Sequence, residues 1–159
     1  MENIKLINFV DLSLEEKKMI LEWRNHPDIK KWMYNQNNIK LDEHLAFIDS
    51  LNCQDNKLYF LVRQDTENIG VIDFYNFDNK ISSEFGFYSN PYTKVAGIGR
   101  ILENISINYA FETLQVKVLK LEVFSDNIQV RNLHKKFKFK EVSKKIVNNK
   151  EVICMELER

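Results

Sequence analysis

Hydrophobic and polar residues follow different patterns in successive segments of the chain. Residues 4–10 alternate weakly between apolar and polar, which predicts a first strand. Ser13 and Glu16 form a capping box that predicts the start of a helix, and Pro27 either ends that helix or begins a second short turn. Residues 42–51 have helical spacing, so a second helix is expected there.

Three runs rich in Tyr, Phe, Val and Ile follow, separated by short polar connectors, as in a meander of hairpins. They are residues 57–63, 68–77 and 81–89. A long helix is predicted from about residue 97 to residue 113, with Ile101 and Ile105 facing inward. A strand, a helix and a closing pair of strands complete the chain, at residues 118–124, 128–137, 139–146 and 152–157. The order predicts an α+β fold with a mixed, mostly antiparallel sheet of about seven strands flanked by about four helices.

The composition excludes some classes of function but does not identify one. With 159 residues, a single domain over residues 1–159 is expected. Lys+Arg and Asp+Glu balance at 23 each, so no overall field attracts nucleic acid or a membrane, and an anionic ligand needs a local site. The start of the chain does not resemble a signal peptide, so a cytoplasmic protein is expected. Cys53 and Cys154 have no metal-binding or redox spacing, and no metal is expected.

The segment Lys-Val-Ala-Gly-Ile-Gly-Arg at residues 94–100 is the first candidate for a ligand site. Gly97 and Gly99 follow a predicted strand and open a predicted helix, where backbone N–H groups can turn towards an anion. Lys94 and Arg100 flank the two glycines and can add charge-assisted hydrogen bonds. By spacing alone, an ordinary helix start is an equal alternative. The segment lacks the Gly-Lys-Ser/Thr of a P-loop and the third glycine of a dinucleotide fingerprint.

Two motifs and the order of elements together resemble the GCN5-related N-acetyltransferases (the GNAT superfamily) over nearly the whole chain. Residues 94–99 match the superfamily's Gln/Arg-x-x-Gly-x-Gly/Ala motif, with Lys94 where Gln or Arg is usual, and Asn127 follows the predicted strand 118–124 as a second motif requires. The resemblance implies acetyl-CoA as co-substrate. It implies a cofactor site made of Phe85, Gly86, Phe87, Tyr88, Lys94, Ala96, Gly97, Ile98, Gly99, Arg100 and Asn127.

The acceptor side is indicated by cations set among aromatic residues. Arg24, His26 and His44 suit an anionic ligand with a planar ring, although each histidine alone is more simply explained as a helix-end or surface residue. Arg-Asn-His-Pro at residues 24–27, with Trp-Met-Tyr and His-Leu-Ala-Phe-Ile downstream, is similar to the nucleotide-sugar N-acetyltransferases of pseudaminic acid biosynthesis. That resemblance implies a small-molecule acceptor, a UDP-linked 4-amino-4,6-dideoxy sugar. The implied contacts are Arg24, His26, Met33, Tyr34, His44 and Asn76.

Three residues are candidates for catalysis. Asp73 lies in an apolar strand beside the predicted cofactor cleft and is the first candidate for the base; a solvated strand position is the alternative. Glu122 is the second candidate, as a proton relay through water, against a surface charge. The superfamily usually has a tyrosine about seven residues beyond the asparagine of its second motif, and here that place is taken by His134. An imidazolium there can protonate the leaving thiolate, and so can water.

The sequence therefore predicts an N-acetyltransferase in which the amine attacks the thioester directly, without a covalent enzyme intermediate. Two alternatives stay open. One is a protein N-terminal acetyltransferase similar to those that modify ribosomal proteins, which would need an open acidic groove. The other is a non-catalytic CoA-binding domain, which would bind CoA without turnover. No nucleic acid or membrane partner is expected, and the chain is expected to act as a monomer or a homodimer.

Overall fold

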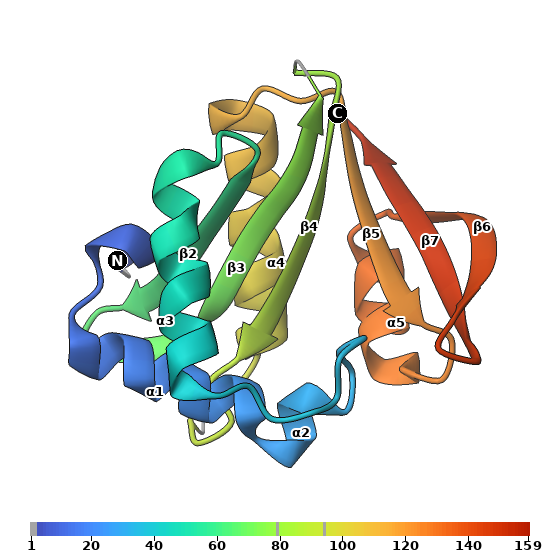
Figure 1. The fold of residues 1–159 in the computed structure, drawn as a ribbon. Coiled ribbons are helices and arrows are strands. Elements are labelled where there is room, and N and C mark those ends of the chain that lie inside the picture. Colours follow the sequence, from blue (N-terminus) through green and yellow to red (C-terminus); the bar gives the residue numbers. More distant parts are fainter. Residues whose placement is uncertain (1–2, 79, 94) are drawn as a thin grey trace.

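One mixed sheet organises the chain in the computed structural model, which describes residues 3–78, 80–93 and 95–159 (Figure 1). The strands in these residues are β1 (Ile4–Asn8), β2 (Lys57–Gln64), β3 (Glu67–Asp78), β4 (Ser82–Ser89), β5 (Val118–Phe124), β6 (Lys140–Val147) and β7 (Lys150–Glu158). Their order across the sheet is β1-β2-β3-β4-β5-β7-β6. Described neighbours are antiparallel, except that β4 and β5 run parallel. The predicted α+β class is confirmed.

Helices cover both faces of this sheet. They are α1 (Leu14–Asn25), α2 (Pro27–Lys30), α3 (Leu41–Ser50), α4 (Ile98–Asn108) and α5 (Ile128–Lys136). Figure 1 shows α1 and α3 in front of the sheet and α4 behind it. Within the described residues, none of the helices is long and apolar enough to cross a membrane.

Strand alternation divides the core between the two faces. Ile72 and Phe74 of β3 belong to the hydrophobic cluster under α4, whereas Val71 belongs to the cluster that Ile20 and Trp23 of α1 complete. Each of these side chains is at most 2% exposed. Burying an apolar side chain of this size contributes about 1.5–3 kcal/mol, so both helix layers are firmly attached to the same strand.

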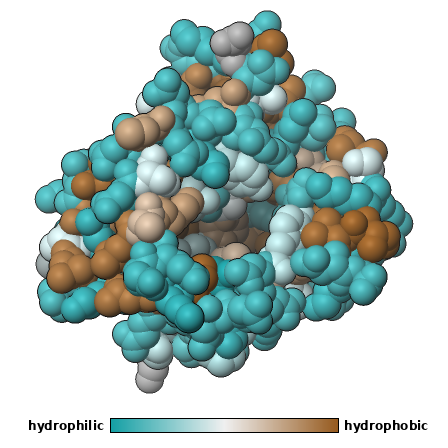
Figure 2. Space-filling view, viewed as in Figure 1, coloured by the Kyte–Doolittle hydropathy of each residue, from teal (hydrophilic) through white to brown (hydrophobic). Residues whose placement is uncertain are grey.

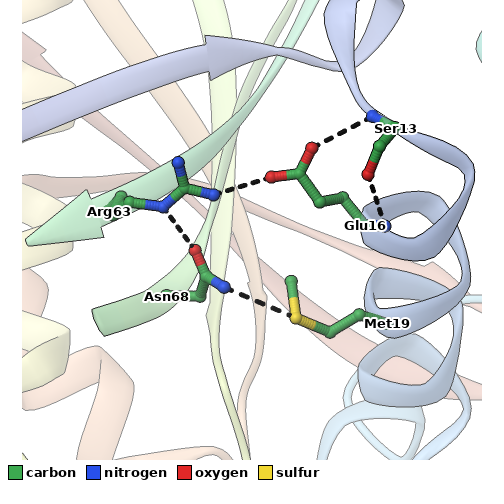
Figure 3. A network of polar contacts seen from close by, with 5 residues as sticks. All are labelled: Ser13, Glu16, Met19, Arg63 and Asn68. Carbon is green, nitrogen blue, oxygen red and sulfur yellow. Dashed lines mark hydrogen bonds and ion pairs between the residues drawn. The ribbon is translucent and has the colours of Figure 1, made fainter. Parts of the chain in front are cut away.

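A polar network fixes the start of α1 against the sheet (Figure 3). The Ser13 Oγ atom accepts from the Glu16 backbone N–H, and the Glu16 carboxylate accepts from the Ser13 N–H, so the predicted capping box is present. The Arg63 Nη2 atom of β2 lies 2.6 Å from Glu16 Oε2, and Arg63 Nε donates to Asn68. The Ser13 N–H and the Arg63 guanidinium lower the pKa of Glu16. The network fixes the orientation of α1, and the last turn of this helix carries the predicted acceptor residue Arg24.

The two halves of the sheet separate between β4 and β5. These strands pair only through Ser82–Glu84 with Val118–Lys120 and then diverge, as Figure 1 shows. The chain after α2 crosses below the open end of this gap (Figure 1). Residues from both halves and both faces can therefore meet at the gap.

Local details differ from the sequence-based expectations. The predicted first strand stops at Asn8, because the Asn8 side chain accepts from the Val10 N–H and starts a 3₁₀ turn. The long predicted helix ends its regular part at Asn108 and continues as a π-helical turn. The centre of its inward face is shifted from the predicted one: Ile98, Leu102, Glu103 and Ser106 are the buried residues of α4, while Ile101 and Ile105 are half-buried and pack against the core from its flank.

Candidate active site

A cleft of about 560 Å³ occupies the gap between β4 and β5. Figure 2 shows the surface hollowed there, with apolar residues towards its floor. Asp73 and Glu122 enter the cleft from the face that α1 and α3 cover, and Phe85 and His134 enter it from the face that α4 and α5 cover. The cleft therefore passes through the sheet, which suits two substrates that meet end to end.

The start of α4 is open to an anion. Gly97 caps the helix in the left-handed conformation (φ 73°), which residues with a Cβ rarely adopt. No side chain caps the first turn and no acidic residue lies in it, so its N–H groups and the helix dipole are available to a phosphate group. Arg100 and Ala96 are exposed beside this turn. Lys94, the remaining basic residue predicted here, lies outside the described residues.

Two residues of the predicted loop have structural reasons of their own. A Cβ on Gly99 would lie 3.2 Å from the Leu133 Cδ2 atom of α5, so this glycine also allows α4 and α5 to pack closely. The side chain of Ile98 is buried in the core at 7% exposure, which leaves its backbone as the part that can contact a cofactor. The sequence interpretation explained both positions by phosphate binding alone and missed these packing roles.

The predicted cofactor residues of β4 line the cleft. Beyond Glu84 no described strand pairs with the side of β4 that faces β5, so the backbone of residues 85–89 has free N–H and C=O groups there. An extended ligand with amide groups can pair with them as a strand would. Asn127, at the start of α5, lines the opposite wall and makes no capping hydrogen bond with its side chain. Phe85, Gly86, Phe87, Tyr88 and Asn127 are thus brought together as expected.

Asp73 points into the cleft between two strands. Its neighbours across the sheet are Tyr59 and Gly86, and a Cβ on Gly86 would lie 3.3 Å from the Asp73 carboxylate. Burial raises the pKa of Asp73 to about 7. Burial, together with the Asp73 charge, also raises the pKa of Tyr59 and Tyr88, so these rings stay neutral. Near neutral pH Asp73 can exchange a proton, and the tyrosines beside it cannot.

Glu122 is already engaged at both oxygens. The Tyr34 hydroxyl donates a hydrogen bond to Oε1, and the Nζ atom of Lys145 of β6 lies 2.6 Å from Oε2. The Asn148 side chain, from the turn between β6 and β7, donates to the backbone oxygen of Tyr34. The Glu122 hydrogen bond and ion pair raise the pKa of Lys145, and burial together with Glu122 raises the pKa of Tyr34. In this arrangement Glu122 holds Tyr34 against β5.

Arg24 presents an unsatisfied donor to the cleft. Its Nη2 atom donates to the Asn35 backbone oxygen over 2.6 Å, whereas Nη1 is buried without a hydrogen-bond partner among the described residues. Burial lowers the pKa of Arg24, but a guanidinium stays protonated. Leaving such a donor unpaired costs about 1–3 kcal/mol or more, which a bound acceptor atom would recover.

Three predicted acceptor residues behave differently from the expectation. His44 lines the cleft, but burial lowers its pKa and its Nε2 atom donates to the Lys17 backbone oxygen, so it is a neutral, tethered ring and not a cation. His26 caps α2 and packs against Tyr92 in a separate surface groove. Asn76 is exposed at an irregularity of β3, bonds to Glu84 and does not line the cleft. The helix cap at His26 and the strand irregularity at Asn76 keep these two side chains out of the cleft.

His134 sits at the deep wall of the cleft on α5. Its Nδ1 atom lies 2.6 Å from Glu103 Oε1 of α4, and the two residues are 5% and 0% exposed. The rings of Phe85, Phe87 and Phe139 surround the imidazole. His134 lines the cleft, and its carboxylate partner was not expected from the sequence.

Comparison with known proteins assigns the family. The family model described as an acetyltransferase (GNAT) domain matches residues 7–140. The chain belongs to the GNAT acetyltransferase family. The predicted acetyltransferase activity is confirmed, and so is acetyl-CoA, the acetyl donor of this family. Among the described residues, no group of three or more His, Cys, Asp or Glu side chains is placed to hold a metal ion.

Several relatives are similar to the chain over most of its length. The acetyltransferase PseH from two strains of Campylobacter jejuni is 47% and 48% identical over 136 residues, which are 86% of this chain and 84% of each relative. The crystal structure of C. jejuni PseH in complex with acetyl coenzyme A matches with a TM-score of 0.81 and 37% identity over 99% of both chains. A Vibrio cholerae spermidine N-acetyltransferase, 19% identical with a TM-score of 0.86 over 99% of this chain and 95% of its own, shares the fold.

The sequence interpretation missed the residues that support the others. Glu103 was overlooked because the apolar spacing of its helix placed Ile101 and Ile105 inward. A residue two positions from each of these isoleucines lies on the other side of a helix. Lys145 and Asn148 come from a hairpin with no motif of its own. Both asparagines of its turn have positive φ angles, Asn148 at 51° and Asn149 at 65°. This is the geometry of a tight two-residue turn, which sets the register from which the Lys145 side chain of β6 reaches Glu122 of β5.

Proposed function

We propose that this acetyltransferase transfers the acetyl group of acetyl-CoA to the 4-amino group of a UDP-linked 4-amino-4,6-dideoxy sugar, a step of pseudaminic acid biosynthesis. The similarity to the two Campylobacter acetyltransferases named PseH supports the pathway. The observation that carries the choice of acceptor is the Nη1 donor of Arg24, a residue that lines the cleft: this atom is buried and has no hydrogen-bond partner among the described residues.

The acceptor end of the cleft matches the chemistry of a nucleotide sugar. Arg24 supplies a positive charge for a phosphate or uracil oxygen, and Trp32 and Met33 supply apolar surface for a ring. Tyr34 is held in place by Glu122. His44 packs beside them as a neutral ring, which leaves Arg24 as the cation for the acceptor in this group. A protonated polyamine has no acceptor atom and would leave the guanidinium unsatisfied, and a peptide would offer it neutral carbonyl oxygens in place of a charged phosphate.

The reaction follows from the two faces that meet at the gap. The neutral amine attacks the thioester carbonyl carbon, and its excess proton passes to a base. Asp73 is the favoured base because its pKa of about 7 suits proton exchange near neutral pH and because it lines the cleft. Glu122, bonded to Tyr34 and Lys145, is the positioning carboxylate in this proposal.

Neither cysteine lines the cleft in the described part of the chain, which supports direct transfer without an acetyl-enzyme. Both substrates are water-soluble nucleotide derivatives, so we place the reaction in the cytoplasm, with a small molecule as the acceptor partner.

The test is a steady-state assay with acetyl-CoA and the UDP-4-amino sugar, read by release of free thiol and by the mass of the product. The matched control is the same UDP-sugar with a 4-hydroxyl group, which should give no transfer. Spermidine and peptides with free N-termini are run at the same concentrations. Faster turnover of either of these than of the amino sugar would overturn the proposed acceptor, and no turnover of any amine would indicate a CoA-binding protein.

A further inference from the structure

The Glu103–His134 pair joins the two helices behind the sheet at the wall of the cleft. Glu103 is fully buried on α4, and one of its oxygens, Oε1, lies 2.6 Å from the His134 Nδ1 atom. The other oxygen, Oε2, is buried and has no hydrogen-bond partner among the described residues. A carboxylate with a single partner in an apolar core is costly unless that partner is a cation or a strong donor.

We propose that Glu103 is a positioning residue for His134: it accepts the Nδ1 proton in a hydrogen bond and so holds the imidazole with Nε2 facing the gap, where Nε2 gives its proton to the departing CoA sulfur. In the acid form both ring nitrogens carry a proton, and the Nδ1 proton stays hydrogen-bonded to Glu103 while Nε2 donates. This inference rests on the proposed direct transfer from acetyl-CoA. It explains how a histidine can serve at this wall of the cleft, because the carboxylate fixes which ring nitrogen faces the sulfur.

The position of His134 follows from the course of the cleft. A cofactor with its phosphates at the start of α4 and its chain along residues 85–89 ends in the gap, where the cleft passes to the other face. The acceptor enters from that other face, beside Asp73. The thioester must lie where the two substrates meet, and His134 lines the cleft on the cofactor's side of this point.

The proton transfer balances in one step. The amine nitrogen bonds to the carbonyl carbon, the carbon–sulfur bond breaks, and its electron pair goes to sulfur. Sulfur takes the Nε2 proton to give the free CoA thiol, while the proton lost by the amine goes to the base on the other face. Solvent then returns a proton to the imidazole and removes one from the base, so no other reactant is needed.

Glu103 is well placed to fix the orientation of the His134 ring. From β4, Phe85 and Phe87 face the imidazole, and from the chain after α5, Phe139 does. The described contacts of His134 thus include three aromatic rings and a single ionisable group, Glu103 of α4. The neighbouring Lys135 of α5 pairs with Glu141 at the surface.

The first experiment needs no acceptor. The chain has three histidines, so their imidazole ¹⁵N signals can be followed by NMR against pH, with His134→Tyr to assign the signal. Glu103→Gln keeps the shape but can donate to Nδ1 as well as accept from it. We expect the neutral His134 ring to change from mainly the Nδ1–H tautomer to a mixture of both tautomers in this variant, seen as a smaller separation of its two ¹⁵N signals at high pH, with the other histidines unchanged. An unchanged separation would overturn the proposal whatever the acceptor is.

The second experiment uses the acetyl-transfer assay with acetyl-CoA and the UDP-4-amino sugar. In Glu103→Gln kcat should fall by about tenfold, because the acid is no longer held in place, with KM for acetyl-CoA within about twofold. In a His134→Tyr background, where a tyrosine is the acid, Glu103→Gln should not lower kcat further. An acetyl thioester of a more acidic aromatic thiol should restore Glu103→Gln, because that thiolate leaves without a proton.

The outcomes separate the two proposals. A kcat that does not fall, or that falls equally in the His134→Tyr background, would reduce Glu103 to a structural residue. Absence of turnover of the sugar, with the NMR shift present, would contradict the proposed acceptor and leave the pair intact.

Discussion

The two ends of the site are built by different means, and the start of α4 lies beyond the residues that line the cleft. The donor end uses backbone: the uncapped first turn of α4 and the unpaired edge of β4 supply N–H and C=O groups, and glycines keep them accessible. The acceptor end uses side chains from distant parts of the chain, with Arg24 on α1, Asp73 on β3, and Glu122 on β5 held by Tyr34 and Lys145. A backbone site suits a cofactor shared by a whole family, whereas a side-chain site can change with the acceptor.

The largest expected effect is at the acceptor end. Asp73→Asn should lower kcat by about a hundredfold or more, because the base is lost, while the Kd of acetyl-CoA is unchanged. In the wild type, kcat should rise with pH through about 7 as Asp73 loses its proton, and this rise should be absent in the variant. Stopped assays from pH 5 to 9 measure it. Glu122→Gln is the matched control: a hundredfold loss there, with Asp73→Asn active, would make Glu122 the base.

Asp73→Asn should also stabilise the protein at high pH. Since burial raises the folded-state pKa of Asp73 above its unfolded value, the folded state binds the proton more tightly, and stability falls as pH rises from about 4 to about 7. Asparagine removes this penalty. Thermal unfolding should show a higher Tm for the variant at pH 8 and little difference at pH 4; a lower Tm at pH 8 would show that the carboxylate contributes to folding.

Arg24→Ala should come next, raising the KM of the UDP-amino sugar by about tenfold to a hundredfold through loss of a charge-assisted hydrogen bond. The Kd of acetyl-CoA, measured by calorimetry, should stay the same. Arg24→Lys should recover only part of the loss, because a lysine does not reproduce the forked guanidinium. An unchanged acceptor KM in Arg24→Ala would remove Arg24 from the site.

Gly97→Ala should act on the donor end alone. The left-handed φ of 73° is strained for alanine by about 1–2 kcal/mol, so acetyl-CoA binding should weaken by up to about thirtyfold, with the acceptor KM unchanged. Gly97→Asn should weaken it less, since asparagine tolerates this conformation. Equal losses in both variants would mean that the side chain blocks the site, although a Cβ there meets no atom within 4 Å.

Arg100→Ala should have the smallest effect. Arg100 is exposed beside the start of α4, so its loss should raise the Kd of acetyl-CoA by about two- to fivefold at low salt and hardly at all at high salt. Titrations at two salt concentrations measure this. A loss that persists at high salt would show a buried contact with the cofactor.

The same contrast explains what the sequence could predict. The sequence predicted the strands and helices that have strong periodicity. It also identified the donor end through the Gly97–Gly99 and Asn127 motifs, because backbone groups that bind a ligand come from neighbouring residues and leave a short motif. Asn76 and His26 were misplaced because a β irregularity and a helix cap turn them away from the cleft. Glu103 and Lys145 were missed because their partners, His134 and Glu122, lie 31 and 23 residues away in the sequence. These pairs are brought together only by the folded structure.

The short contact between β4 and β5 also affects how the molecule responds to its cofactor. Three residue pairs join the half formed by β1–β4 to the half formed by β5–β7. Acetyl-CoA lying in the gap would act as a substitute strand and would couple the unfolding of the two halves. Binding at about 100 times Kd adds about 2.7 kcal/mol of stability. Slower amide exchange should then spread from β4 into β5, so the cofactor completes the cooperative unit as well as supplying the acetyl group.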